Sequence, residues 1–281
     1  MNKDDGFTLN SQWRFSEEEA GRRWPAVGED IQALGARLDD LGPKRPVTGS
    51  PLDDDDEASD PYRVSSAAFN CLTVGGDHLR ALELLVVGNR VLHLTAAASL
   101  TRGALEALST GFWILHPAER AERIARVRRW YGQNLNDQAR ALGERRSAAA
   151  KAAAPKLKGK TYKSTDAVSY TEANAPLPGL LFAWQLCSGF AHSRPWATLG
   201  WSQRTATSIP DTDLAVVSLT NSAARALYPV LPAVELITIL VDLYERRGFT
   251  DLPCAPHHRL GSSVTLRTAG VAYAPRAAKA S

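Results

Sequence analysis

A few ionisable side chains lie in two otherwise apolar segments of this 281-residue chain. Within residues 94–115 the ionisable side chains are Arg102 and Glu106, and the apolar segment 178–190 is followed closely by His192. An arginine can hold a phosphate or another anion, and an imidazole that titrates near neutral pH can act as a general acid or base. These residue types together predict anion binding coupled to proton transfer.

The spacing of these residues predicts that they share helix faces. Arg102 and Glu106 are four residues apart, and Ser188 and His192 have the same spacing on the second segment, with Gln185 just before them. If the two faces meet, they form one polar cluster, in which Glu106 orients the arginine or the imidazole. We therefore predict His192, Arg102, Glu106 and Ser188 as the catalytic set.

A structural interpretation of the same cluster stays open. Charges on apolar helices are costly unless they are paired, and a buried polar group can serve to fix the register between helices. Asp77 and His78 follow the Gly75-Gly76 pair, where we expect a helix kink, and they could join the cluster.

Charge is unevenly distributed along the chain. Residues 119–163 carry 13 basic and 4 acidic side chains, whereas residues 1–60 carry 7 basic and 15 acidic ones. Arginines can contact phosphates and a tryptophan can stack on bases. The candidates for nucleic-acid binding are Arg120, Arg123, Arg126, Arg128, Arg129 and Trp130. Alternatively, this helix face is simply solvated, or the two regions neutralise each other.

Several functional classes have no support in the sequence. The complete G-x-G-x-x-G and G-x-x-x-x-G-K-[ST] strings of nucleotide-binding loops do not occur, since Gly159-Lys160-Thr161 lacks the glycine five residues earlier. The acidic run 53–56 lacks the glycine and the closing glutamate of an EF-hand loop, and Cys254-x-x-His257-His258 is half of a zinc site without a second half. We predict neither a metal nor a cofactor.

The sequence predicts a cytoplasmic protein. Three widely separated cysteines favour a reducing compartment, and the polar, acidic N-terminus does not resemble a signal peptide. The most apolar stretch, 226–241, contains two prolines and a glutamate, so we expect a buried bundle helix and no membrane partner.

The periodicity of apolar residues predicts an all-α fold, a helical bundle. Ser16 to Glu19 has the form of a capping box, and an apolar stripe then runs from Trp24 to Leu41, interrupted at Pro25, where we expect a break. The stripe could seal the bundle or contact a second copy, and packing within the chain is favoured because it spans under three heptads.

We predict four regions. Residues 1–42 form an N-terminal helical segment and residues 43–60 a flexible acidic linker. Residues 61–248 form the bundle domain, which includes a basic flexible insertion at 143–177, and residues 249–281 form a disordered tail. Within the bundle, helices are expected from 61 to 87, from 92 to 116, from 117 to 142, from 178 until Pro195, and from Asp211 or Asp213 to Arg247.

Three strings resemble a pattern of uncharacterised helical proteins from high-GC actinobacteria: DHLRALELLVVG, SLTRGALEALSTGFWILHP and WQLCSGFAHSRP. The arrangement also resembles, more distantly, HEPN-type helical domains, many of which are ribonucleases of toxin and defence systems and often form dimers. Their motif has an arginine and a histidine on one helix, with four to six residues between them. Here His192 matches the histidine, but Gln185, Leu186 and Cys187 occupy the arginine positions, so the motif is incomplete.

Three hypotheses follow. The first is a HEPN-like protein that binds RNA and cleaves it without a metal, as a homodimer if it follows the family. The second is a non-enzymatic helical scaffold or regulatory module that binds other proteins. The third is a small-molecule enzyme or binder with a pocket lined by Trp113, Trp184 and Phe190.

Overall fold

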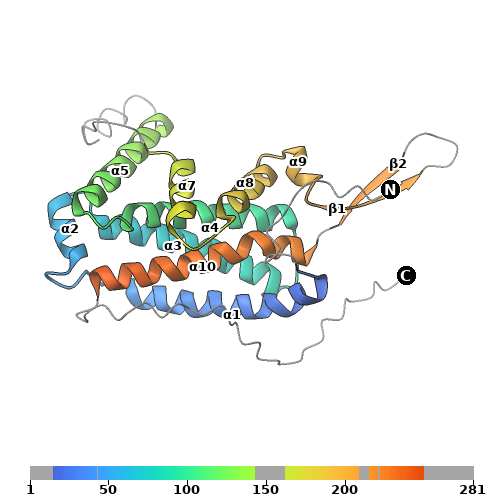
Figure 1. The fold of residues 1–281 in the computed structure, drawn as a ribbon, viewed down its shortest axis with the longest axis horizontal. Coiled ribbons are helices and arrows are strands. Elements are labelled where there is room, and N and C mark those ends of the chain that lie inside the picture. The colour runs from blue at the N-terminus through green and yellow to red at the C-terminus, as the bar shows by residue number, and fades with distance from the viewer. Residues whose placement is uncertain (1–14, 43, 143–161, 209–214, 221, 250–281) are drawn as a thin grey trace. The chain divides into compact units, whose positions relative to one another are not determined.

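A computed structural model describes residues 15–42, 44–142, 162–208, 215–220 and 222–249 of the chain. Most of these residues are helical, and the long helices pack side by side (Figure 1). The predicted all-α bundle is therefore confirmed. The predicted tail from 250 onward, with its Cys254-x-x-His257-His258 string, lies outside the described residues.

Helix α1 (Glu17–Leu41) begins at the predicted capping box. The Ser16 hydroxyl accepts from the Glu19 N–H, and the Glu19 carboxylate accepts from the Ser16 N–H. The helix continues through Pro25, contrary to our expectation. A proline removes one helix hydrogen bond, and burial of the apolar stripe on both sides of it, from Trp24 to Leu41, holds the helix together.

The predicted acidic linker is wrong over residues 51–59, which form helix α2 (Pro51–Ser59). The Ser50 hydroxyl accepts from the Asp53 N–H, and Pro51 occupies the first turn, where its missing N–H costs nothing. Leu52 and Asp55 are fully buried. One face of the aspartate run is therefore not solvated, because Asp55 forms an ion pair inside the protein.

Helix α3 (Val64–Glu83) runs without the predicted kink and continues into a π-helical turn, η2 (Leu84–Gly88). The glycine pair serves close packing instead. A Cβ atom at Gly75 would lie 2.5 Å from Leu108 Cγ, and one at Gly76 would lie 2.9 Å from Leu38 Cδ1. These glycines let neighbouring helices approach the α3 backbone.

Helices α4 (Leu94–Leu115) and α5 (Arg120–Leu142) agree with the predicted helices, although α5 starts three residues after Pro117. The predicted flexible insertion is wrong for residues 164–174, which form helix α7 (Ser164–Asn174). Ala167, Val168 and Thr171 of α7 are buried, so this helix belongs to the bundle. Residues 143–161 lie outside the described part of the chain.

Helix α8 (Leu180–Ala191) is followed by the short helix α9 (Pro195–Thr198), which Pro195 opens. The antiparallel strands β1 (Gln203–Ser208) and β2 (Ala215–Thr220) come next and form a hairpin beyond the bundle (Figure 1). The predicted helix start near Asp211 or Asp213 is therefore wrong over 215–220, although those two residues are not described. The string AVVSLT is rich in β-branched residues, which favour strands.

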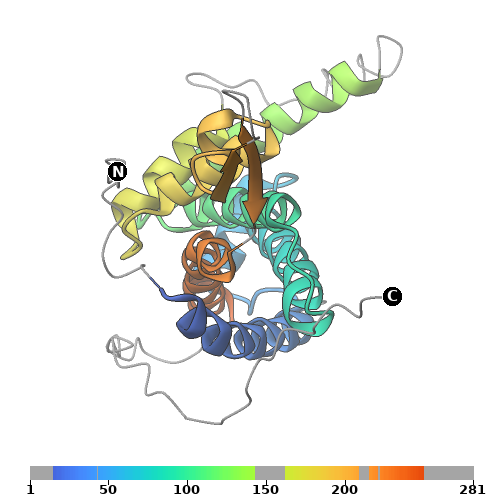
Figure 2. The same cartoon turned by 90° about the vertical axis from the view of Figure 1, so that its right-hand side faces the viewer.

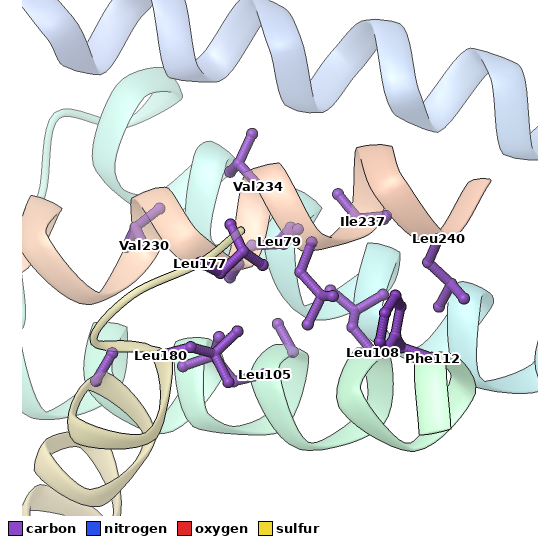
Figure 3. Packing of buried hydrophobic residues seen from close by; sticks show 14 of the residues in the cluster. Leu79, Leu105, Leu108, Phe112, Leu177, Leu180, Val230, Val234, Ile237 and Leu240 are labelled. Atoms are coloured by element: carbon purple, nitrogen blue, oxygen red, sulfur yellow. The ribbon is translucent and has the colours of Figure 1, made fainter. Parts of the chain in front are cut away.

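Helix α10 (Ala223–Gly248) packs against α1, α3, α4 and α8. The end-on view in Figure 2 places it among the other helices, and Figure 3 shows Ile237 and Leu240 of α10 in one buried cluster with Leu108 and Phe112 of α4. By length and composition α10 could cross a membrane, but 72% of its apolar window is buried inside the protein. This burial agrees with the predicted core helix.

Helices α1 and α10 run in the same direction and are joined at both ends. The Ala223 N–H donates to Glu17 Oε2 over 3.0 Å, and the Trp24 indole N–H donates to the Ala223 carbonyl over 3.2 Å. At the other end Arg37 donates to Asp242 Oδ1 over 2.6 Å and also pairs with Glu245. The N-terminal stripe therefore packs within the chain, as expected.

Candidate functional site

The predicted contact between the two polar helix faces is present. Arg102 Nη2 lies 3.0 Å from Glu106 Oε2 on α4, and Arg102 Nε donates to Ser188 Oγ of α8 over 3.0 Å. The Trp184 indole N–H donates to Glu106 Oε2 over 3.4 Å. Arg102 contacts Ser188 and Glu106 contacts Trp184, so the two helices run antiparallel. Two side chains four residues apart on α4 therefore meet two side chains four residues apart on α8.

This polar cluster is open to solvent. The side chains of Arg102 and Glu106 each remain 30% exposed, on a helix whose opposite face is fully buried. The ion pair is thus neither sealed in the core nor free in bulk water. A guanidinium carries five N–H donors, and among the described residues Arg102 Nη1 has no partner. The arginine therefore retains donors that an incoming anion could use.

His78 of α3 lies against the same stretch of α4. A Cβ atom at Gly103 would overlap the His78 imidazole, with Nε2 as its nearest atom. The half-buried imidazole therefore packs directly on the α4 backbone at Gly103. The sequence placed His78 at a helix break from which it could join the cluster, whereas it is an interior residue of a continuous helix. The sequence signal for this contact is Gly103, the residue after Arg102, because a glycine leaves room for a neighbouring side chain on the helix backbone.

His192 does not join these contacts. Helix α8 ends at Ala191, and His192 occupies the C-cap position with its side chain exposed. Ser193 follows with a positive φ of 53°, and the Arg194 N–H donates back to the Gly189 carbonyl over 2.7 Å. Since the backbone turns here, helical spacing from Ser188 no longer predicts where the imidazole points. Among the described residues the His192 ring has no hydrogen-bond, ion-pair or ring partner.

Two of the predicted nucleic-acid contacts turn inward. Arg123 is 4% exposed, and its Nε donates to Asp55 Oδ2 over 2.5 Å while Nη1 donates to the Pro117 and Ala118 carbonyls. Arg126, whose side chain is 11% exposed, pairs with Glu122. A role for Arg123 in phosphate binding is therefore wrong, because its donors are consumed inside the protein.

The other basic candidates lie nearer the surface. Arg120 faces Asp54, and Arg128 donates to the Ala58 carbonyl over 3.3 Å, so both reach the acidic helix α2. Arg129 lies 3.6 Å from Glu122, and the half-buried Trp130 packs edge-on against Tyr131. Much of the positive charge of α5 is therefore met by acidic neighbours, which was one of the alternatives left open.

The sequence missed a second histidine cluster. His116, expected to be a helix cap, does sit at the C-cap of α4, but its Nδ1 also lies 3.0 Å from the Tyr170 hydroxyl and its ring stacks on Phe112. Burial, with Arg247 and Arg126 nearby, lowers the pKa of His116 below its ordinary value. The neutral imidazole is thus favoured at this position.

The remaining candidates are structural. Cys71 and Cys187 are fully enclosed, and burial raises the pKa of both thiols, which makes them poor nucleophiles. Across the described ranges no cluster of three or more His, Cys, Asp or Glu side chains could hold a metal ion. Trp113 and Phe190, which we expected to line a pocket, are buried in the core instead.

Comparison of this chain with protein-family models, curated proteins and solved structures finds no match. The functional argument therefore depends on the site's own geometry.

Proposed function

We propose that this chain binds RNA across the surface formed by α3, α4 and α8 and cleaves it without a metal, with His78 as the general acid and base and Arg102 as the phosphate ligand. The observation that carries the proposal is the imidazole of His78 packed on Gly103, one residue along α4 from an arginine that keeps unpaired donors. Helices α3 and α4 thus carry the two residue types of the HEPN motif, of which the α8 segment has the histidine, His192, but not the arginine.

The proposed reaction is an internal transfer within the RNA. The imidazole of His78 accepts the proton of a 2′-hydroxyl, whose oxygen then bonds to the adjacent phosphorus. The bond to the 5′-oxygen breaks, and that oxygen takes the proton back from the His78 imidazolium, so the upstream product ends in a 2′,3′-cyclic phosphate. Arg102 stabilises the charge that develops on the phosphoryl oxygens.

Glu106 and Ser188 are positioning residues in this proposal. Glu106 and Ser188 together fix the plane of the Arg102 guanidinium. Trp184 in turn restrains Glu106 from α8. His192, our first candidate for the acid and base, is replaced by His78 in this role because it lies at the frayed end of α8, without a partner in the described structure.

The test is cleavage of a labelled single-stranded RNA by the purified full-length chain in the presence of EDTA. His78→Gln is expected to slow cleavage by about 100-fold or more, the usual worth of general acid–base catalysis. The matched controls are His192→Gln and His93→Gln, and both are expected to stay within about twofold of the parent. Mass spectrometry of the product end checks for the cyclic phosphate.

Two outcomes would contradict the proposal. One is a folded parent protein that leaves every RNA intact, and the other is His78→Gln cleaving as fast as the parent. The Arg102→Gln variant separates binding from chemistry, because loss of a phosphate contact weakens RNA binding and makes it less sensitive to salt.

A second candidate function is the non-enzymatic scaffold. The inward-facing arginines of α5 favour it, and so do the contacts of Arg102 with Ser188 and of Glu106 with Trp184, since both arrangements join helices within the protein. It predicts that Arg102→Met with Glu106→Leu keeps the fold, because matched apolar replacement of a paired charge is often tolerated. Retained RNA cleavage by this double variant would count against both candidates. Homodimer formation and a cytoplasmic location stay predictions.

A further inference from the structure

A hollow of about 720 Å³ lies at the end of the bundle that carries α2. It is enclosed by the loop 44–48 after α1, by α2, by the first turns of α3, and by Tyr244 of α10. Sites for small organic ligands commonly have volumes of about 300–1,000 Å³, so this hollow has a suitable size.

Two aromatic rings form the apolar part of the lining. The rings of Phe69 and Tyr244 have centroids 5.9 Å apart. Tyr244 is only 3% exposed, but its hydroxyl is not among the buried polar atoms that lack a partner in the described ranges. The hydroxyl at the edge of this hollow can therefore exchange a hydrogen bond to water for one to a group from outside the chain.

Carboxylates from α2 and the following turn line one side of the hollow. Asp53 accepts from the Gly49 N–H over 3.0 Å, Asp56 accepts from the Ser65 N–H over 2.8 Å, and Asp60 lies 3.7 Å from Arg63 Nε. Glu57, which is exposed, also lines the hollow, and the described residues offer it no partner. Among the described residues its carboxylate is therefore open to a ligand's positive group.

Cations line the other side. Lys44 is held by Asp40 over 2.8 Å, and Arg63 is only loosely engaged by Asp60. Arg45 is exposed, and in the described part of the chain it has no ion-pair partner. One positive charge is thus uncompensated, in the same hollow as the free carboxylate.

We infer that this hollow binds a small zwitterion that carries an ammonium group, a carboxylate and an apolar or aromatic body, as an α-amino acid or a dipeptide does. The ammonium group would face Glu57, the carboxylate would face Arg45, and the body would rest on Phe69 beside the Tyr244 hydroxyl. A ligand with one charge only would leave Glu57 or Arg45 unsatisfied and meet repulsion from the other side.

This site is separate from the proposed RNA surface. Ser65, at the edge of the hollow, and His78 are on the same helix, α3, 13 residues apart. At a rise of 1.5 Å per residue this separation corresponds to about 20 Å. The inference therefore does not rest on the proposed function, and each can fail alone.

The test is titration calorimetry of the full-length chain with three probes of similar shape: L-phenylalanine, phenethylamine and 3-phenylpropanoate. The zwitterion is expected to bind with a Kd below about 1 mM, and each singly charged probe at least about tenfold more weakly. Glycyl-L-phenylalanine extends the comparison to a dipeptide. The inference is overturned if none of the probes binds up to about 10 mM, or if phenethylamine binds as tightly as L-phenylalanine.

Variants locate the site. Glu57→Gln and Arg45→Gln are each expected to weaken L-phenylalanine binding by about tenfold or more, and Tyr244→Phe tests the hydroxyl without removing the ring. Glu29→Gln and Arg194→Gln are matched controls of the same chemistry outside the hollow. If both of the first two variants bind as the parent does, the zwitterion lies elsewhere and the inference is wrong. Circular dichroism confirms that each variant is folded.

Discussion

At the scale of single residues, the buried pair of Asp55 and Arg123 is the strongest internal electrostatic contact that the structure describes. Asp55 is fully buried and accepts from Arg123 Nε and from Nη2, the latter over 2.8 Å. The Pro117 and Ala118 carbonyls take up the other guanidinium donors. Because four of the five guanidinium donors are taken up, the pair ties α2 to α5 without leaving a bare charge in the interior.

Asp55→Asn is therefore expected to reduce the free energy of unfolding by about 3–5 kcal/mol, since Arg123 would keep a buried and uncompensated charge. Urea denaturation followed by circular dichroism measures this loss. The control is Asp39→Asn, which breaks the exposed contact with Arg80 and should cost less than about 1 kcal/mol. Similar losses in the two variants would show that burial of the first pair has no energetic consequence.

Gly103 has a comparable role for His78. Gly103→Ala places a methyl group where the imidazole lies, so the ring must move away from the α4 backbone. We expect this substitution to lower RNA cleavage by about tenfold or more while the fold is kept, since catalytic geometry tolerates little displacement. A changed resonance of the His78 imidazole in the NMR spectrum would report the movement. An unchanged cleavage rate with a displaced ring would argue against His78 as the acid and base.

Spacing along the sequence predicted part of this site. Arg102, Glu106 and Ser188 meet because each lies well inside a regular helix, where four residues return to the same face. The same rule failed for His192, because the helix ends one residue before it. The count of charges in α5 also did not distinguish Arg123 from its exposed neighbours. Such a count does not show which arginine meets an aspartate from a distant segment.

At the scale of elements, small residues decide how closely the helices approach. Gly75 of α3 faces Leu108 of α4, and Gly111 of α4 faces Leu240 of α10. The sequence suggested a kink at the first of these positions, since glycine weakens an isolated helix. Packing against α4 outweighs that weakness, so the helix continues and the glycine becomes a contact point.

Gly75→Ala is expected to destabilise the protein by about 1–3 kcal/mol, because the new methyl group must push Leu108 out of a packed layer. Gly21→Ala is the matched control. Nothing lies within 4 Å of its Cβ position on α1, so the change should instead stabilise by about 0.5–1 kcal/mol through helix propensity. Thermal unfolding of both variants gives the comparison. Equal effects of the two changes would contradict the packing argument.

The long amphipathic helices were predictable for a physical reason, and the short elements were not. The capping box and stripe of α1 form a local pattern with a period near 3.6 residues, so the helix could be assigned from its own sequence. Helix α2 depends on Arg123 and Ser65, which lie far away in the chain, and the hairpin of β1 and β2 depends on the pairing of two short strands. Neither α2 nor the hairpin can therefore be assigned from the few residues around it in the sequence.

At the scale of the whole molecule, His116 links stability to pH. Its pKa is lowered by burial and by Arg247 and Arg126. The unfolded chain therefore binds a proton near pH 6.5, at a pH where the folded protein does not. Stability consequently falls as pH decreases from about 7.5 through 6.5 and toward the lower folded-state pKa.

The His116→Gln variant removes this titration while keeping a group that can bond to Tyr170. The difference in unfolding free energy between parent and variant should shrink or reverse as pH is lowered from about 7.5 to 5.5, because the parent alone pays the cost of excluding the proton. Urea denaturation at three pH values measures it. Parallel pH profiles for the two proteins would contradict the argument.

The joining of α1 to α10 has a consequence for synthesis of the chain. The partners at each end of this contact are 199 to 208 residues apart. At about 5–20 residues per second, a ribosome needs roughly 10–40 s to extend the nascent chain from the first helix to the last. During that interval the face of α1 that packs against α10 in the folded protein lacks this partner helix. Nascent chains stalled before residue 223 should therefore be cut readily by protease within residues 17–41, and chains released after residue 248 should resist.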